Sequence, residues 1–374
     1  MKKPLLPLLL VIPLLMACEL TNTITLLNAE TKGHFTDVQL DYLNSKDYSN
    51  TDPYNGIMSV SAPLPVNITW ESNEKISYSV EFFEEEDCNA NSLIVTYETD
   101  ETSFDFYNPI FGQDYYVRVM GYKDGTSKRF KPSNIKSFKE TPTVKGPRNI
   151  YVEGVENFRD IGGWGYIKQG MLYRSGCFNE EKAIPVKVTI SDAGIHEVTK
   201  NLKIKTEIDL RRTSNDEVGS LTDKSVLGDS VNYIQLPMLY GGNNILTFTG
   251  LYGADTYEYD NPAMIKRFFE ILAVEDNYPI NFHCLIGKDR TGCLAYLVEG
   301  LLGFDQETMY RDYMFTNFSD AGMCKLTDIT DRYGKTIEQY ENGESLQEKI
   351  YNYLNEVIGV SKDNLDSVIN ILKL

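Results

Sequence analysis

One segment of the chain combines a cysteine, an arginine and several glycines at spacings that suit phosphate chemistry. It reads PINFHCLIGKDRTGCLAYLVEGLLG and covers residues 279–303. Cys284 follows an apolar run, and Arg290 follows Cys284 after five intervening residues. A thiolate is a strong nucleophile, and a guanidinium group can hold two oxygens of one phosphate. The pair therefore predicts a site that attacks a phosphate ester through sulfur.

The elements around this pair are predicted to be a strand and a helix. The run before Cys284 is apolar and β-branched, as in a buried strand. The apolar residues after it have helical spacing, at Leu294, Leu297, Val298, Leu301 and Leu302. Gly303 is suited to end that helix. A strand, a tight loop and a helix N-terminus direct backbone N–H groups and the helix dipole at one point, which favours a bound anion and the thiolate form of Cys284.

The loop between the two elements is the predicted phosphate-binding loop. It consists of Leu285, Ile286, Gly287, Lys288, Asp289 and Arg290. Gly287 allows close approach of the backbone to the anion. The Thr291 hydroxyl can stabilise the thiolate when it leaves, and His283 can help to fix the loop. Lys288 either binds a second phosphate or acidic group, or is a solvated loop lysine.

The stretch HCLIGKDRTG, residues 283–292, resembles the phosphate-binding loop of cysteine-dependent protein tyrosine phosphatases. Its GKDRTG form is similar to that of the bacterial secreted tyrosine and dual-specificity branch, some members of which also act on phosphoinositides. ENFRDIGGW (156–164), MLYRSG (171–176) and IKTEIDLRRTSNDE (204–217) resemble the same branch. The resemblance extends over residues 146–374.

The resemblance implies a mechanism and a set of roles. Cys284 attacks phosphorus and forms a phosphocysteine, while Arg290 and the loop N–H groups hold the phosphate oxygens. No metal or other cofactor is expected, because the loop supplies the positive field. The three histidines, His34, His196 and His283, are scattered along the chain and do not form a metal-binding pattern.

The general acid has two candidates. Related enzymes commonly carry an aspartate after the strand that corresponds to NYIQLPM (232–238), but the residues that follow here, LYGGNNILTFTG, contain none. Asp289, inside the loop, is the favoured candidate because it is adjacent to the phosphate position. Asp209 is the second candidate, and its alternative role is a structural ion pair with Arg211 beneath the loop.

Four other charged residues are interpreted without a direct chemical role. Asp255 and Asp260 follow later in the chain and are typical of solvated loop residues. Arg159 and Asp160 in NFRDIGG are either a scaffold turn or a support that orients the loop.

The predicted fold has two domains. Residues 146–374 alternate strand-like and helical runs, which predicts an α/β domain with a largely parallel central sheet flanked by helices. Residues 56–145 contain short β runs and turns, which predicts a small β-sandwich. With Trp70 and Tyr115 in its strands, the sandwich resembles a fibronectin type III domain; it is either a spacer or a ligand-binding module. Because every motif follows it, residues 146–374 are expected to be soluble and active alone.

The N-terminus predicts export. Residues 1–17 have the layout of a signal peptide, and Leu15 to Cys18 resembles a lipobox, which implies lipidation of Cys18 and a membrane-anchored lipoprotein; the alternative is a plainly secreted protein. Residues 18–55 are polar and are interpreted as a tether. The five cysteines after Cys18 are an odd, irregularly spaced set, which argues against a disulfide framework.

The composition limits the partners. The formal net charge is −18, from 36 basic and 54 acidic residues, so nucleic acid is not an expected partner. The sequence predicts a phosphorylated protein or a phosphoinositide as substrate. The predicted function is that of a protein tyrosine or dual-specificity phosphatase. Two alternatives remain: an inositol-phosphate or phosphoinositide phosphatase, and a catalytically silent adhesion or phospho-binding protein.

Overall fold

The computed structural model describes most of the chain after the predicted leader. The described residues are 23–51, 62–123, 129–180, 188–212, 224–240, 245–252, 257–319, 322 and 324–374. The predicted signal peptide and Cys18 lie outside them, as does Asp255. None of the helices in these ranges has the length and apolar character needed to cross a membrane.

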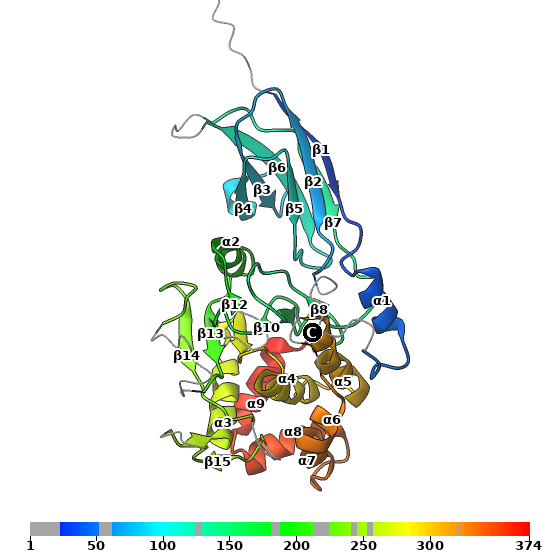
Figure 1. Ribbon diagram of the computed structural model, residues 1–374, viewed down its shortest axis with the longest axis vertical. Coiled ribbons are helices and arrows are strands. Elements are labelled where there is room, and N and C mark those ends of the chain that lie inside the picture. Colours follow the sequence, from blue (N-terminus) through cyan, green and yellow to red (C-terminus); the bar gives the residue numbers. More distant parts are fainter. Residues whose placement is uncertain are drawn as a thin grey trace, which may run out of the picture.

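The N-terminal part consists of two antiparallel sheets around one core (Figure 1). The first sheet has the order β1 (Ile24–Glu30), β2 (Val66–Ser72), β5 (Ser103–Phe106). The second has the order β4 (Leu93–Thr99), β3 (Ser77–Phe83), β6 (Asp114–Tyr122), β7 (Lys136–Lys139). Alternate residues of β6 are buried, as expected for a strand with one face on a core. Residues from both sheets, among them Trp70, Phe82 and Phe106, form one hydrophobic cluster.

The prediction of a tether over residues 18–55 was wrong for part of that range. Residues 24–30 form β1, which pairs with β2, so the two-sheet unit begins before residue 56. Residues 37–44 form helix α1 (Asp37–Asn44), which begins at a capping box made by Thr36 and Gln39. The polar residues of ITLLNAE concealed a strand because only alternate positions of it face the core.

The C-terminal part contains the predicted, largely parallel sheet. Its order is β14 (Asn232–Gln235), β13 (Thr206–Asp209), β17 (Ile280–His283), β10 (Leu172–Ser175), β9 (Arg159–Asp160), β8 (Arg148–Asn149). The first four strands run parallel to one another, and the last two join as antiparallel edge strands. Two short pairs complete the strands: β11 (Asn179–Glu180) with β12 (Val188–Thr189), and β15 (Thr249–Gly250) with β16 (Tyr259–Asp260).

Helices cover this sheet (Figure 1). They are α2 (Asp192–His196), α3 (Asn261–Leu272), α4 (Asp289–Leu301), α5 (Gln306–Phe315), α6 (Thr327–Ile329), α7 (Lys335–Glu338), α8 (Leu346–Asn352) and α9 (Lys362–Leu372). The predicted helix after the loop is α4, which is buried from Arg290 to its end and contacts β10, β17, α5 and α8. Gly303 follows it with φ +96°, the left-handed conformation that suits a helix stop. Asp260 is the N-cap of α3 and accepts the Ala263 N–H.

The segment between β1 and β2 also contributes to the C-terminal core. Phe35, Tyr42 and Leu43 belong to the same hydrophobic cluster as the helices of the α/β part. The Tyr42 ring lies 5.5 Å from that of Phe318, and its hydroxyl donates to the Arg311 carbonyl at 3.3 Å. Residues 146–374 alone therefore lack part of their own core, which conflicts with the expectation that they are self-sufficient.

His34 lies where these parts of the chain meet. Its imidazole is buried, its Nε2 is 3.0 Å from the Asn149 carbonyl, and its ring meets those of Phe35 and Phe111 edge-on at 5.2 Å. Burial, reinforced by the nearby charge of Arg148, lowers the pKa of His34 to about 3. The folded protein therefore holds this histidine neutral.

This burial predicts a loss of stability in mild acid. In the unfolded chain His34 takes up a proton below pH about 6.5, whereas in the folded chain it does so only near pH 3, so the free energy of unfolding is expected to fall by about 1.4 kcal/mol per pH unit between them. Denaturant unfolding at pH 7 and pH 5 measures this slope. His34→Gln, which keeps an N–H for Asn149, is expected to reduce it. His196→Gln, a change of a less buried histidine, is the control; a slope unchanged by His34→Gln would contradict the assignment.

Candidate active site

Cys284 lies at the C-terminal edge of the parallel strands. In the register of the sheet, Ser175 and Asp209 are the neighbours of His283 on the two sides of β17. Cys284 follows directly and is only 2% exposed. The carboxyl edge of a parallel sheet is the usual place for ligand sites in α/β proteins, because the loops that leave the strands converge there.

The loop after Cys284 is held by donors on its outer side. Three of its carbonyl oxygens accept hydrogen bonds: Leu285 from the Cys177 N–H at 3.0 Å, Ile286 from Asn157 Nδ2 at 3.0 Å, and Gly287 from Arg174 Nη2 at 2.8 Å. In a trans peptide the C=O and the following N–H point in opposite directions. The N–H groups of residues 286–288 are therefore directed to the opposite side of the loop, where an anion is expected to bind.

Gly287 is required by this geometry. Its φ is +72°, and a Cβ at this position would lie 2.5 Å from the Ser175 carbonyl oxygen and 2.8 Å from Asn157 Nδ2. Both distances are far below contact distance, and the backbone oxygen cannot move aside. The predicted role of Gly287 in bringing the backbone close to its neighbours agrees with this crowding.

Arg290 lies in the first turn of α4, and its guanidinium is already oriented. Its Nη1 donates to the carbonyl oxygens of Leu210 at 3.2 Å and Met238 at 3.3 Å, which follow β13 and β14. The guanidinium carbon lies 5.1 Å from the centre of the Tyr240 ring. Such contacts restrict the side chain, so less conformational entropy is lost when it binds an anion.

Thr291 follows Arg290 in α4, and its predicted role toward the thiolate stays a prediction. The side chain is completely buried, and its Oγ1 has no hydrogen-bond partner among the residues that the structure describes. A buried hydroxyl without a partner is costly, so a site of this kind favours an additional acceptor such as a thiolate.

Two arginines and one aspartate brace the loop from below. Arg159 Nε lies 3.1 Å from Asp312 Oδ1, and Arg174 Nη1 lies 2.5 Å from Asp312 Oδ2. Burial alone would raise the pKa of Asp312, but the two arginines outweigh it and the pKa lies below its usual value. Arg159 also donates to Asn157, which itself holds the Ile286 carbonyl. Arg159 is thus connected to the loop through one side chain, as expected for a support that orients it.

Asp160 has a scaffold role in this structure. Its carboxylate pairs with Arg148 Nη2 at 2.7 Å and accepts the N–H groups of Gly162 and Gly170, each at 2.8 Å. These contacts fix the turn between β9 and β10 rather than the phosphate-binding loop.

Asp209 forms the ion pair that was the structural alternative for it. Its Oδ2 lies 2.7 Å from Arg211 Nη2 and accepts the Tyr233 hydroxyl at 2.8 Å. Burial would raise the pKa of Asp209, but His283 and Arg211 together hold it well below its usual value. A carboxylate held in its ionised form carries no proton to donate, so this geometry argues against Asp209 as the general acid.

His283 is fixed beside the loop. Its Nε2 is 2.9 Å from Glu207 Oε1, and its Nδ1 is 3.2 Å from the Cys284 carbonyl oxygen. These two contacts agree with the predicted role of His283 in fixing the loop.

The two charged residues in the middle of the loop contact the C-terminal helices. Asp289 Oδ1 lies 3.2 Å from Arg332 Nη1, and Lys288 Nζ lies 3.1 Å from Asp328 Oδ2. The prediction of Lys288 as either a solvated lysine or a second phosphate ligand did not include this ion pair. Asp289 keeps 21% of its side chain exposed and begins the helix whose next residue is Arg290.

Several residues of the site were missed by the sequence analysis. Asn157 and Arg174 contact the loop, and Tyr240 lies beside Arg290. Asp312 is connected to the loop through its ion pair with Arg174. All four are far from the loop in sequence. An acidic residue within the apolar stretch MYRDYMF was the signal available for Asp312. Within the described residues, no group of three or more potential ligands is arranged to hold a metal ion. The expectation of a metal-independent reaction stays a prediction.

Comparisons with known proteins agree on one family. Residues 150–373 match the family model described as the tyrosine phosphatase family. A protein of Cupriavidus necator that is named as a tyrosine-protein phosphatase is 24% identical over 203 residues, which cover 48% of this chain and 67% of the relative.

Solved structures were matched as well. The catalytic core of the PP-IP phosphatase Siw14 of S. cerevisiae, in complex with citrate, has a TM-score of 0.32 and 19% identity, covering 52% of this chain and 91% of the other. TpbA of P. aeruginosa has a TM-score of 0.25 and 20% identity, and the match covers 40% of this chain and 72% of TpbA.

Proposed function

This chain belongs to the tyrosine phosphatase family, whose model its residues 150–373 match, and we propose that Cys284 is the nucleophile of its metal-independent phosphatase reaction. The observation that carries the proposal is the arrangement of the loop, whose carbonyl groups at residues 285–287 are held outward so that its N–H groups face the anion. The proposal is also supported by Arg290 in the same loop, whose guanidinium is held in place by the carbonyl oxygens of Leu210 and Met238.

The reaction proceeds in two displacements at phosphorus. In the first, the Cys284 thiolate forms a bond to phosphorus in line with the leaving oxygen, the P–O bond breaks, and the leaving oxygen takes a proton from the general acid. In the second, water gives a proton to the carboxylate that served as the general acid and attacks phosphorus, the P–S bond breaks, inorganic phosphate leaves, and the thiolate is restored. Arg290 and the loop N–H groups stabilise the charge on the phosphate oxygens in both steps. The Thr291 hydroxyl donates to the thiolate as it leaves.

The proposed substrate is a phosphorylated protein. The enzyme would act on phosphotyrosine alone, or on phosphotyrosine and phosphoserine or phosphothreonine. A phosphoinositide or inositol phosphate is the second candidate, since it presents the same phosphomonoester to the loop. The catalytically silent alternative is set aside, because the chain keeps the cysteine and the arginine of its family in a braced loop.

A phosphate-release panel tests the function. We expect phosphate release from at least one of four substrates: phosphotyrosine peptide, phosphoserine peptide, phosphoinositide vesicles and inositol hexakisphosphate. Release is expected to be unchanged by EDTA. Activity that is abolished by EDTA and restored by a divalent cation would contradict the metal-independent mechanism, and the preferred substrate distinguishes the two candidates.

Asp289 is the proposed general acid, and its replacement is expected to depend on the leaving group. Asp289→Asn should slow turnover of phenyl or alkyl phosphate about 10²- to 10⁴-fold, yet barely slow an activated aryl phosphate whose leaving group needs no proton. Asp209→Asn should reduce both substrates similarly, because it breaks the buried pair with Arg211. Steady-state kinetics with both esters measures the difference.

Asp328→Asn is the matched control for that comparison. Asp328 lies in the same group of ion pairs, on Lys288 and near Arg332, but is not part of the loop. It should leave the ratio of the two rates unchanged. A leaving-group effect in Asp209→Asn, with a uniform loss in Asp289→Asn, would reverse the assignment.

We also propose export and anchoring through a lipid on Cys18, with the two-sheet unit as a fibronectin type III-like spacer. The spacer is supported by Tyr115, whose hydroxyl accepts the Ile110 N–H at 2.8 Å, as a tyrosine-corner residue does with nearby backbone. Cys18→Ser is expected to move the protein from the membrane fraction to the soluble fraction, which cell fractionation with immunoblotting measures. Retention of the Cys18→Ser protein in the membrane fraction would contradict a lipid anchor at this residue.

A further inference from the structure

A pocket of about 860 Å³ lies between the two-sheet unit and the α/β domain. Its walls come from β4, β5 and their flanking residues on one side, and from Tyr151, Glu153 and the α2 region on the other. The size is that of sites for small organic molecules, which often lie where two structural units meet. None of the residues that line this pocket belongs to the phosphate-binding loop.

The walls of this junction pocket are fixed to one another by Glu197, the first residue of the short π-helix η4 (Glu197–Asn201). Its carboxylate accepts the Tyr97 hydroxyl at 2.5 Å, Asn108 Nδ2 at 2.7 Å and Asn201 Nδ2 at 2.7 Å. Asn108 Nδ2 also donates to the Tyr151 carbonyl at 2.8 Å. Because these bonds join both units, the pocket does not depend on a chance contact between mobile parts.

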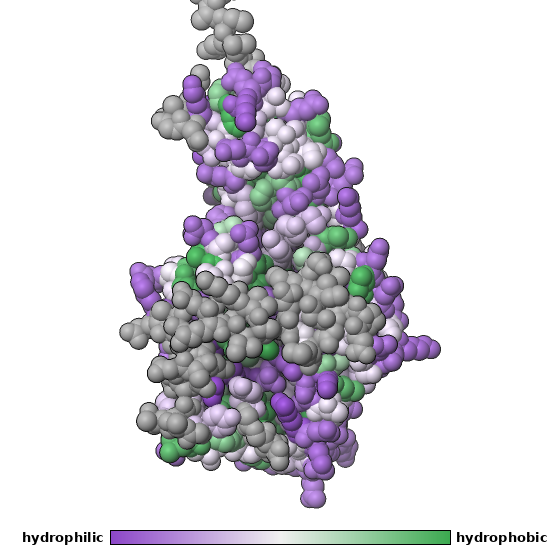
Figure 2. All heavy atoms as spheres, in the orientation of Figure 1, coloured by the Kyte–Doolittle hydropathy of each residue, from purple (hydrophilic) through white to green (hydrophobic). Residues whose placement is uncertain are grey.

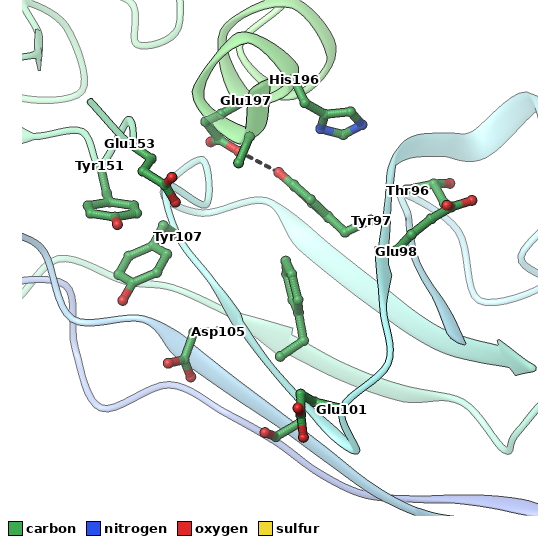
Figure 3. Close-up of a pocket in the computed structure, with 13 residues that line it drawn as sticks. Thr96, Tyr97, Glu98, Glu101, Asp105, Tyr107, Tyr151, Glu153, His196 and Glu197 are labelled. Atoms are coloured by element: carbon green, nitrogen blue, oxygen red, sulfur yellow. Dashed lines mark hydrogen bonds between the residues drawn. The ribbon is translucent and has the colours of Figure 1, made fainter. Parts of the chain in front are cut away.

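Two pairs of aromatic rings form much of the lining. The centres of Tyr107 and Tyr151 are 4.3 Å apart, and those of Tyr97 and Phe104 are 4.8 Å apart. In Figure 3, Tyr107 and Tyr151 lie to the left of the pocket, and Tyr97 lies to the right. Aromatic faces carry partial negative charge and attract cations.

Carboxylates complete the lining at separate places. Figure 3 shows Glu153 toward one end and Asp105 and Glu101 toward the other, with the Tyr107 ring between them. All three residues are exposed, and Asp105 Oδ1 accepts a hydrogen bond from the uncharged Asn67 Nδ2 at 2.8 Å. The described residues that line the pocket include no lysine or arginine. The charged groups at the two ends of the pocket are therefore carboxylates.

We propose that this junction pocket binds a linear polyamine, a molecule with ammonium groups joined by methylene stems. Carboxylates at the two ends match ammonium groups at the two ends of such a molecule, and the rings between them match its apolar stem through cation–π and hydrophobic contacts. A neutral sugar would gain from the rings but not from uncompensated carboxylates, and an anion would be repelled.

Calorimetric titration of the full chain with spermidine tests the proposal. At about 150 mM salt, which screens surface charges beyond roughly 8 Å, we expect saturable binding of one spermidine per chain. Tyr107→Ala and the double variant Glu101→Gln/Asp105→Asn should each weaken it at least about tenfold, since either change removes one class of contact. Unchanged phosphate release in these variants shows that they fold.

The double variant Glu71→Gln/Glu86→Gln is the matched control. It also removes two negative charges, but from exposed positions of the two-sheet unit that do not line the pocket. It should bind spermidine within about twofold of the parent chain, because the proposed contacts are intact. Equal weakening in the control, equal binding of uncharged 1,8-octanediol, or the absence of saturable spermidine binding would each overturn the proposal.

Discussion

Replacing Cys284 by serine is expected to lower turnover by about 10⁴-fold or more, the size of effect seen when a covalent nucleophile is removed. The serine hydroxyl is far less ionised than the thiol at neutral pH and so attacks phosphorus poorly. Binding of inorganic phosphate should persist, because the loop N–H groups and Arg290 form the anion site and remain in place. Phosphate-release kinetics and calorimetric titration with phosphate measure the two quantities.

Cys293→Ser provides the control for this experiment. Cys293 lies on α4, is completely buried, and its pKa is raised by that burial, so it is an inert core thiol. Its replacement should cost some stability but leave turnover of the folded enzyme within a few-fold of the parent. Full activity in Cys284→Ser would eliminate the covalent mechanism, and loss of phosphate binding in it would mean that the sulfur itself holds the loop open.

Removing residues 1–145 is expected to destabilise the α/β domain severely. The deletion takes away Phe35, Tyr42 and Leu43, which are buried in the core of that domain. Truncation of one buried aromatic residue typically costs about 3–5 kcal/mol. The whole free energy of unfolding of a domain is about 5–15 kcal/mol. We therefore expect the fragment 146–374 to be insoluble or to melt at least about 10 °C below the full chain.

Point variants separate docking of α1 from loss of the sheets. Tyr42→Ala in the full chain should lower the free energy of unfolding by about 3 kcal/mol, because it removes the ring from Phe315 and Phe318. Asp41→Ala, on the exposed face of the same helix, should change it by less than about 0.5 kcal/mol. A fragment 146–374 that melts at the same temperature as the full chain would show that α1 does not stabilise the domain.

The features that the sequence predicted are those encoded by residues close together in the chain. The apolar spacing after Thr291 predicted the buried helix α4, and the run before Cys284 predicted strand β17. The Cys284-to-Arg290 loop predicted an anion site, because a strand end, a loop and a helix start are contiguous and constrain one another locally. The parallel character of the central strands followed from the alternation of strand-like and helical runs.

The ion pairs that brace the loop could not be predicted in this way, although Arg159 was a candidate for a supporting role. Arg159, Arg174 and Asp312 come from β9, β10 and α5, and their ion pairs exist only because the sheet and α5 are brought together by the fold. The same holds for Tyr240 beside Arg290 and for Lys288 beside Asp328. A charged residue in an apolar stretch, such as Asp312 in MYRDYMF, can indicate a buried charge, but no local pattern identifies its distant partner.

The chain's own sequence therefore determined the chemistry, through the identity and spacing of Cys284 and Arg290, and the class of fold, through local periodicity. Only the tertiary structure decided that Asp209 is held ionised by Arg211 and His283, and that Phe35, Tyr42 and Leu43 belong to the core of the α/β domain. The physical reason is range: periodicity and loop conformation arise from neighbours within a few residues, whereas burial and charge pairing depend on contacts between residues far apart in the chain.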